Sequence, residues 1–282
     1  MKCLVTGHSG LIGSHLVDKL LSEGHEVFGI SRTDRNYNPH CQNFLLDLRD
    51  TIGAKKIIES ISPEIVFALA ANAAEGKSFF SPIDITTNNV NVFLNTLVPS
   101  IRTGHLKRFV FTSSIAVYGA LSTPFKETDL PIPQDIYGIS KLTNEKILEV
   151  MSNVHGFEFV TIRPHNVFGP RQNMSDPYRN VVTLFMNHLL KNQQYSIYGD
   201  GEMKRCFSYV KEVVDIIYRS GFENVSGMTF NVGSNIIWSI NQLSELIQRV
   251  SGIKIEPKYL PIRTLEVHDA IADHFLVNKY FG

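Results

Sequence analysis

At 282 residues, the chain is long enough to bury a large core in one domain or in two closely joined lobes. Its 27 basic and 27 acidic side chains cancel, so no overall charge favours a nucleic acid or an anionic membrane as partner. The three cysteines are widely spaced and the ten histidines are scattered, so we expect neither a disulfide framework nor a metal site. The sequence shows no signal peptide and no convincing membrane span, and we expect a protein of the reducing cytoplasm.

The first predicted element is a strand at residues 3–5 that leads into a glycine-rich turn at residues 6–13 and then into a helical pattern. In the spacing Gly-x-x-Gly-x-x-Gly, Gly7 permits a tight turn, Gly10 lets the backbone approach a pyrophosphate, and Gly13 lets the helix pack close to the strand. The helix N-terminus offers unpaired N–H groups and the positive end of its dipole to phosphate. This stretch therefore predicts a dinucleotide-binding site.

Short apolar runs continue to alternate with helical patterns through the first half of the chain. Further strands are expected at 27–30, 44–46, 65–68, 108–111 and 159–162, and helices near 52–60, 83–103 and 138–154. This alternation is typical of right-handed crossover connections between parallel strands. It predicts an α/β fold with a doubly wound parallel sheet, the Rossmann arrangement.

The alternation ends after residue 162. A loop-rich stretch at 163–177 is followed by a helix at 179–191 and a strand at 195–198. A helix at 211–219 and a strand near 228–231 are expected to return to the sheet. We therefore predict a Rossmann domain at 1–165, completed by about 207–235, and a smaller mixed α/β substrate-binding lobe at 166–206 and 236–282.

A tyrosine and a lysine stand four residues apart in the helical stretch near 138–154. Positions four apart share one face of a helix, so Tyr137 and Lys141 are expected to be neighbours. A lysine ammonium beside a phenol lowers the phenol's pKa from about 10, which suits the tyrosine to act as a general base. The hydroxyl-rich stretch at 112–119 follows a predicted strand and is expected to face the same cleft.

These motifs together resemble the extended short-chain dehydrogenase/reductase superfamily, and within it the NAD-dependent epimerase/dehydratase family of nucleotide-sugar enzymes, in particular its UDP-glucose 4-epimerase-like members. The resemblance covers nearly the whole chain. The motifs that carry it are residues 6–13, 47–49, 112–119, 137–141, 163–172 and 199–205.

The resemblance implies a role for each matching residue. Tyr137 matches the catalytic tyrosine, Lys141 the lysine that holds the nicotinamide ribose, and Ser114 the residue that hydrogen-bonds the reacting sugar hydroxyl. The residues implied in binding the cofactor are Gly7, Gly10, Leu11, Ile12, Gly13, Ser31, Arg32, Asp47, Leu48, Leu69, Ala70, Ala71, Asn88, Thr112, Tyr137, Lys141 and Pro164. The residues implied in binding a nucleotide sugar are Ser114, Asn166, Asn180, Val181, Arg205 and Arg263, with both arginines on the diphosphate.

Two positions after Ser114 bear on the reaction. Members of the family share one opening step, in which C4 of the sugar loses hydride to the cofactor. Related dehydratases carry an Asp-Glu pair directly after the Ser/Thr and related decarboxylases a Glu, whereas this chain has Ile115 and Ala116, which transfer no proton. The resemblance therefore implies a nucleotide-sugar 4-epimerase that acts on a UDP-hexose or UDP-N-acetylhexosamine through a transient 4-keto intermediate. The alternatives are an NAD(P)-dependent reductase/dehydrogenase or dehydratase, and a non-catalytic NAD(P)-sensing binding protein.

The chain departs from the family pattern at two places. Many NAD-binding relatives have an acid at the end of the second strand, but this chain has Ser31 and Arg32 there, with Arg35 nearby, so NADP is an alternative to NAD. The resemblance does match Asp47 to the acidic group that lies near the adenine in the family. Relatives also continue beyond the segment that matches 273–282, so the substrate lobe is expected to be short at its C-terminal end.

Two expectations concern packing and assembly. Phe79, Phe80, Phe93 and Phe109 are most simply explained as core residues. Related enzymes form homodimers through a four-helix seam, and we expect a homodimer here. The apolar face made by residues 94, 97, 98 and 101 is open to two interpretations, the dimer seam or internal packing.

Overall fold

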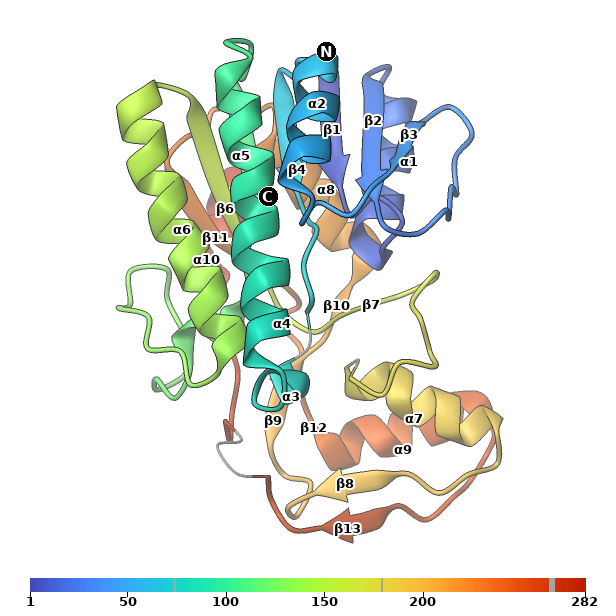
Figure 1. Cartoon of the computed structure of the whole chain (residues 1–282). Coiled ribbons are helices and arrows are strands. Elements are labelled where there is room, and N and C mark those ends of the chain that lie inside the picture. Colours follow the sequence, from blue (N-terminus) through green and yellow to red (C-terminus); the bar gives the residue numbers. More distant parts are fainter. Residues whose placement is uncertain (74, 179, 264–266) are drawn as a thin grey trace.

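The computed structural model describes residues 1–73, 75–178, 180–263 and 267–282. At the centre of the described chain lies a seven-stranded sheet in which every neighbouring pair is parallel (Figure 1). The doubly wound sheet predicted from the alternation is confirmed, and the strand order reverses between β1 and β4, where α/β proteins bind ligands. The strand order is β11 (Met228–Val232), β6 (Glu158–Pro164), β5 (Arg108–Thr112), β4 (Ile65–Ala68), β1 (Lys2–Thr6), β2 (Glu26–Ser31) and β3 (Gln42–Leu45).

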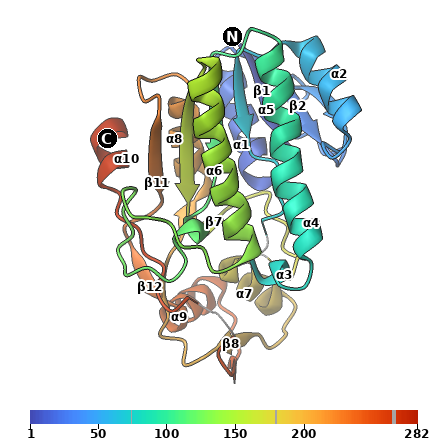
Figure 2. The same ribbon diagram turned by 60° about the vertical axis from the view of Figure 1, so that its left-hand side comes forward.

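Helices cover both faces of this sheet, which is why its central strands are continuous apolar runs. Every residue of β4 and β5 is buried. One face is covered by α1 (Leu11–Ser22), α8 (Val210–Ser220) and α10 (Phe275–Phe281), and the other by α2 (Thr51–Ile61), α5 (Val92–Arg102) and α6 (Ile136–His155) (Figures 1 and 2). The side chains of Leu16, Leu20 and Ile217 fill the first interface, and those of Ile58, Leu97 and Leu148 the second.

The helix expected at 83–103 is present, but it has a widened turn. It begins as α4 (Pro82–Thr86), passes through a π-helical turn at Thr87–Asn91 and continues as α5. Such turns insert one residue into a helix and often occur at functional sites. Of the four apolar residues that suggested a seam, Leu97 is fully buried and Leu94 and Ile101 pack against the same core, which favours internal packing.

A smaller lobe lies beyond the carboxyl ends of the strands (Figure 1). Its helices α7 (Val181–Leu190) and α9 (Ile240–Ser251) share a hydrophobic core that includes Phe185, Leu189 and Leu243. Two short strand pairs complete it: the parallel pair of β8 (Ser196–Tyr198) with β13 (Lys258–Leu260), and the antiparallel pair of β9 (Lys204–Cys206) with β12 (Ile237–Ser239). The helix and strand expected near 179–198 are therefore confirmed as α7 and β8.

The C-terminal helix is not part of this lobe. Val277 and Phe281 of α10 are buried in the core between the sheet and α8, and α10 lies beside β11 (Figure 2). The prediction that the lobe runs from 236 to 282 is wrong for residues 275–281, because two apolar residues four apart on a short helix did not reveal which core they join.

The chain leaves the sheet for the smaller lobe twice. In each excursion, residues at its start contact residues at its end. The first is closed by the parallel pair of β7 (Val167–Phe168) and β10 (Ser208–Tyr209). The second is closed by the side chains of Asn235 and His274, whose Oδ1 and Nδ1 atoms are 2.8 Å apart. The imidazole of His274 also stacks on that of the fully buried His165, with the two Nε2 atoms 2.9 Å apart.

No helix in the described ranges is long and apolar enough to cross a membrane.

Candidate active site

A cavity of about 1670 Å³ lies between the carboxyl ends of the sheet strands and the smaller lobe. Every residue that the sequence analysis assigned to the cofactor, to the substrate or to catalysis lines it. These residues come from both parts of the molecule and from segments as distant as Gly7 and Arg263, so the fold brings them into one space. Nowhere in the described chain do three His, Cys, Asp or Glu side chains gather in a way that could hold a metal ion.

The glycine-rich turn forms one wall of the cavity. Gly7 has a φ of +72°, a conformation that glycine adopts without strain. A Cβ atom on Gly13 would lie 2.3 Å from the carbonyl oxygen of Gly7, so only glycine allows α1 to start this close to the turn. The N-terminus of α1 therefore faces the cavity with its N–H groups, and no acidic side chain lies in its first turn.

Tyr137 and Lys141 lie in the first two turns of α6 and are both buried, as their spacing predicts. The carboxylate of Asp135 begins this helix by accepting a hydrogen bond from the N–H of Gly138 at 2.9 Å. A Cβ atom on Gly138 would lie 2.6 Å from the carbonyl oxygen of Ala116, so glycine lets the start of α6 approach the turn after β5. This contact places the tyrosine next to the segment that contains Ser114.

Ser114 ends the extended segment after β5 and begins a short 3-10 helix, Ile115–Tyr118. Its Oγ accepts a hydrogen bond from the N–H of Ala116 at 3.1 Å, and its own hydroxyl hydrogen can be donated to a ligand. Ser114, Ile115 and Ala116 all line the cavity. The two positions that carry acids in dehydratases therefore border the cavity here with apolar side chains.

Lys141 is held by the backbone of the neighbouring strand. Its Nζ donates to the carbonyl oxygen of Thr112 at 2.7 Å and lies 5.8 Å from the ring centroid of Tyr137. Burial lowers the pKa of Lys141 to about 7, although the charge of Glu145 opposes this shift. The amine can thus change its charge near neutral pH, beside the tyrosine expected to exchange a proton.

This lowered pKa predicts a pH-dependent stability. The unfolded chain holds the proton of Lys141 up to about pH 10.5 and the folded chain only up to about pH 7, so the burial penalty is full below pH 7 and is relieved as pH rises. Relative to Lys141→Met, the wild type should gain about 3 kcal/mol of unfolding free energy between pH 6 and pH 9. Urea unfolding of nucleotide-free protein at several pH values measures this difference, and a pH-independent difference would contradict the shift.

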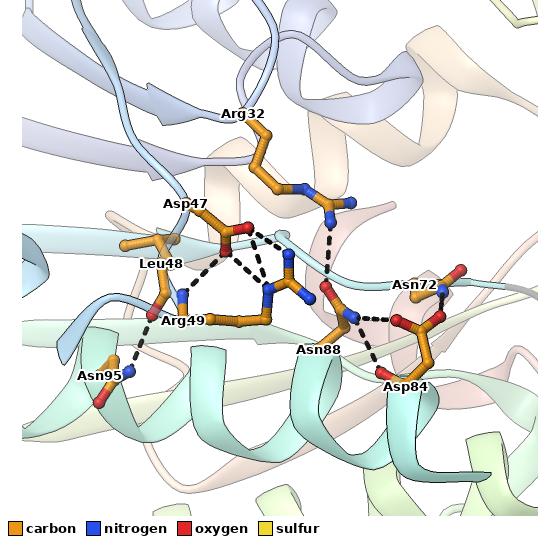
Figure 3. Close-up of polar contacts among 8 residues, drawn as sticks. All are labelled: Arg32, Asp47, Leu48, Arg49, Asn72, Asp84, Asn88 and Asn95. Atoms are coloured by element: carbon orange, nitrogen blue, oxygen red, sulfur yellow. Dashed lines mark hydrogen bonds and ion pairs between the residues drawn. The ribbon is translucent and has the colours of Figure 1, made fainter. Parts of the chain in front are cut away.

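At the far end of the cavity, polar side chains from the segment after β2, the segment after β3 and the helix 82–102 lie close together (Figure 3). Asp47 forms a bidentate ion pair with Arg49, with an Nη2–Oδ2 distance of 2.6 Å. The carbonyl oxygen of Leu48 accepts from Asn95, which fixes the segment after β3 to α5. Arg32 extends across this end of the cavity and donates to the Oδ1 of Asn88 at 3.1 Å.

The asparagines expected to bind substrate also organise the backbone of the smaller lobe. Asn166 has a φ of +34° and donates to the carbonyl oxygen of Cys206 at 2.9 Å. Asn180 begins α7, where its Oδ1 accepts from the N–H of Thr183 and its Nδ2 donates to Val167. Val181 is the first residue of that helix and faces the cavity with Asn180.

The two arginines expected on a diphosphate are held differently. The guanidinium of Arg205 donates to the carbonyl oxygens of Lys204, Val267 and His268, so it joins the segment after residue 266 to β9. The guanidinium of Arg263 lies over the ring of Tyr198, 3.8 Å from its centroid. Both side chains border the cavity, and a stacked, planar guanidinium presents its edge to oxygen ligands.

The sequence model of the NAD dependent epimerase/dehydratase family matches residues 3–233. The chain belongs to this family. A UDP-glucose 4-epimerase of Mycolicibacterium smegmatis is 32% identical over 295 aligned residues, which cover 100% of this chain and 93% of that protein. A UDP-N-acetyl-alpha-D-glucosaminuronate decarboxylase of Bacillus cytotoxicus is 26% identical over 95% of this chain and 85% of its own length.

A solved structure with the same architecture is that of a UDP-glucose 4-epimerase from Thermotoga maritima with UDP-glucose. It superimposes with a TM-score of 0.94 and 32% sequence identity, covering 99% of this chain and 92% of that one. Membership of the NAD-dependent epimerase/dehydratase family, inferred from the motifs, is therefore confirmed.

This family member has a buried ionic network behind the cavity that the sequence did not reveal. Arg163 pairs with Glu145 through two contacts, at 2.6 and 3.0 Å, and the side chains of both are less than one-tenth exposed. Ser113 donates to the same carboxylate, and Arg163 donates to the hydroxyl of Tyr118. The network joins β6 to the segment after β5, which carries the serine of the site, and to α6, which carries the tyrosine and the lysine.

A loop of the smaller lobe also reaches across to α1. Arg171 pairs with Asp18 at 2.7 Å and stacks on the ring of Tyr37, and residues 171–173 border the cavity. The φ of Arg171 is +68°, an uncommon conformation for a side-chain-bearing residue that nothing in the sequence signalled.

Two phenylalanines lie where the sequence did not place them. Phe79 and Phe80 are 47% and 83% exposed and border the cavity mouth, so the prediction that they are core residues is wrong. Phe93 and Phe109 are buried in the core as expected. The difference follows from the backbone, because residues 79 and 80 form a turn before α4 rather than part of the buried helix.

Proposed function

We propose that the protein is a nucleotide-sugar 4-epimerase that acts on a UDP-hexose or its N-acetylated form with NAD as its resident cofactor. One observation carries the proposal: Ser114, Tyr137 and Lys141 border one cavity, while the two positions after Ser114 hold Ile115 and Ala116. The names of relatives with about one-third identity over the whole chain support the same reaction and the UDP-sugar class.

The residues present fit a nicotinamide dinucleotide. The turn at Gly7–Gly13 leaves no room for a Cβ atom at Gly13 and faces the cavity with a helix N-terminus, as a pyrophosphate requires. The buried hydroxyl of Thr112 lacks a hydrogen-bond partner among the described residues and borders the same space. We infer that the glycine turn holds the pyrophosphate, the segment at Asp47–Leu48 holds the adenine, and Lys141 holds the nicotinamide ribose.

In the proposed reaction, the cofactor supplies a reversible hydride acceptor for C4 of the sugar. The chain's residues handle the proton and the geometry. Tyr137 takes the C4 hydroxyl proton as general base and returns it as general acid, and Ser114 orients that hydroxyl by a hydrogen bond. Lys141 favours the phenolate by its positive charge. Asn180 and the stacked Arg263 lie where they can hold the nucleotide part of the substrate.

Epimerisation at C4 needs no second acid or base, whereas loss of water does. Among the described residues, the carboxylates that line the cavity are those of Asp47 and Asp135. Asp47 is paired with Arg49 at the far end of the cavity. Asp135 caps α6, and burial raises its pKa. Neither follows Ser114, where the dehydratases of the family carry their acids.

The test is the product formed from candidate sugars. Purified protein is incubated with UDP-glucose, UDP-galactose or their N-acetylated forms without added NAD, and the C4 configuration is read by proton NMR. The proposal expects interconversion of one pair with no net change in cofactor redox state. Loss of water or carbon dioxide would identify a dehydratase or a decarboxylase, and a need for stoichiometric NAD(P) would identify a dehydrogenase or reductase. Binding without turnover would identify a sensing protein.

We propose further that the enzyme is a homodimer. The exposed face of α6 carries Ile139, Val150 and Val154, which are 46%, 59% and 70% exposed and lie on one side of the helix. Light scattering is expected to show about twice the 31.8 kDa of one chain, and Val150→Lys with Val154→Glu to yield the monomer. A wild-type mass of one chain would contradict the proposal.

A further inference from the structure

The end of β2 is the position at which Rossmann sites distinguish the two nicotinamide dinucleotides. An acidic side chain there accepts the 2′-hydroxyl of the adenosine ribose and repels a 2′-phosphate, whereas an arginine accommodates the phosphate. In this chain the last residue of β2 is Ser31. Its side chain borders the cavity, and its Oγ donates to the carbonyl oxygen of Thr33 at 2.8 Å. The position therefore carries no negative charge.

The neighbouring carboxylates do not replace the missing acid. Asp47 borders this end of the cavity, but Arg49 contacts both of its oxygens, at 3.0 Å and 2.6 Å (Figure 3). These hydrogen bonds lower the pKa of Asp47, and the nearby charge of Arg32 adds to the effect. Asp34 is exposed and does not line the cavity. The charge of Asp47 is thus neutralised by Arg49, and the carboxylate of Asp34 lies outside the cavity.

Arg32 supplies a positive charge at the same place. Its Nη1 donates to the Oδ1 of Asn88, and the Nδ2 of Asn88 is held by the backbone and side-chain oxygens of Asp84, both at 2.8 Å. Asn88 is 4% exposed, so this chain of contacts (Figure 3) holds the guanidinium of Arg32, which borders the cavity, in place. Within the described residues no carboxylate pairs with Arg32. Arg35 borders the cavity three residues later.

We propose that this end of the site binds a 2′-phosphate, so that the protein takes up NADP as well as NAD. The inference rests on the proposed function only in that the cavity must hold a nicotinamide dinucleotide. A phosphate monoester carries about −1.5 to −2 charges at pH 7 and accepts forked hydrogen bonds from a guanidinium. Arg32 offers its remaining N–H groups to that phosphate, and Ser31 leaves room for it without repulsion.

The experiment measures which dinucleotide the protein holds. Purified full-length protein is dialysed against an equimolar mixture of NAD and NADP until the bound ratio is constant, and the released nucleotides are quantified by mass spectrometry. We expect at least one NADP bound for every NAD. Ser31→Asp should shift the ratio towards NAD at least tenfold, because it restores the repelling charge. Arg32→Ala should shift it in the same direction by about tenfold.

Arg249→Ala is the matched control, because Arg249 is an exposed arginine on α9 outside the cavity and its loss should leave the ratio unchanged. A wild-type protein that holds less than one NADP per ten NAD would overturn the inference. A change smaller than twofold in the NADP-to-NAD ratio of both variants would also overturn it. If Arg32→Ala does not fold, the ratio measured for Ser31→Asp decides this point. Binding of NAD without NADP leaves the proposed epimerase intact, whereas binding of neither dinucleotide contradicts both proposals.

Discussion

Replacing Tyr137 by phenylalanine should lower the rate of C4 epimerisation by about 10²- to 10⁴-fold while the bound dinucleotide stays at wild-type content, because general acid–base catalysis contributes that much. The substitution removes only the hydroxyl oxygen of a buried side chain on the second residue of α6, so the helix and its Asp135 cap remain. The measurement is the initial rate on the sugar pair that NMR identifies, together with the nucleotide released on denaturation.

Tyr280→Phe provides the matched control for the Tyr137 variant. Tyr280 lies on α10, is 39% exposed and does not line the cavity, so loss of its hydroxyl should leave the rate within a factor of two or so of wild type. A Tyr137→Phe enzyme that keeps its rate would remove this residue from the mechanism. A variant that loses the dinucleotide would instead assign Tyr137 to cofactor binding.

Removing one partner of the Arg163–Glu145 pair should destabilise the fold strongly. The pair is buried, and either single substitution leaves an uncompensated charge in the core. Glu145→Ala or Arg163→Ala is therefore expected to cost about 3–5 kcal/mol of unfolding free energy, whereas a double substitution by methionine should recover most of that loss. Urea unfolding followed by circular dichroism measures both.

The exposed pair Lys146–Glu149 on the same helix is the control for this comparison. Its atoms are 3.1 Å apart, but both side chains are more than half exposed, so Glu149→Ala should cost less than about 1 kcal/mol. If Glu145→Ala and Arg163→Ala each lower the unfolding free energy no more than Glu149→Ala does, the buried pair is dispensable for stability. A double variant as unstable as the single ones would show that its hydrogen bonds to Ser113 and Tyr118 matter more than its charges.

The parts that the sequence predicts well are those with a local cause. The alternation of apolar runs and helical patterns predicts the parallel sheet, since buried parallel strands need continuous apolar residues. The glycine spacing predicts the turn, and the structure gives the reason in the 2.3 Å approach at Gly13. The spacing of Tyr137 and Lys141 predicts one helix face, and both residues are buried in the first turns of α6.

The features that were missed depend on contacts between distant segments. Nothing in the local sequence around Arg171 shows that it will pair with Asp18, 153 positions earlier in the chain. The same holds for Tyr118 and Asn231, whose side chains hydrogen-bond between the 3-10 helix after β5 and strand β11. Phe79 and Phe80 look like core residues by composition, and only the turn before α4 exposes them. Side-chain type alone does not reveal such long-range pairings.

The contacts that close the two excursions separate the smaller lobe from the sheet. Residues 169–207 begin and end at the β7–β10 pair, and residues 236–273 begin and end at Asn235 and His274, so each could change length with little effect on the sheet. Doubling the length of a loop whose ends already meet costs only about 0.6 kcal/mol in closure entropy. The two excursions share the core around Phe185 and Leu243, however, and would have to be exchanged together. We therefore expect that exchanging both excursions together would transfer the preference for a sugar nucleotide from one relative to another. Ser114, Tyr137 and Lys141 lie outside the exchanged segments and would be unchanged.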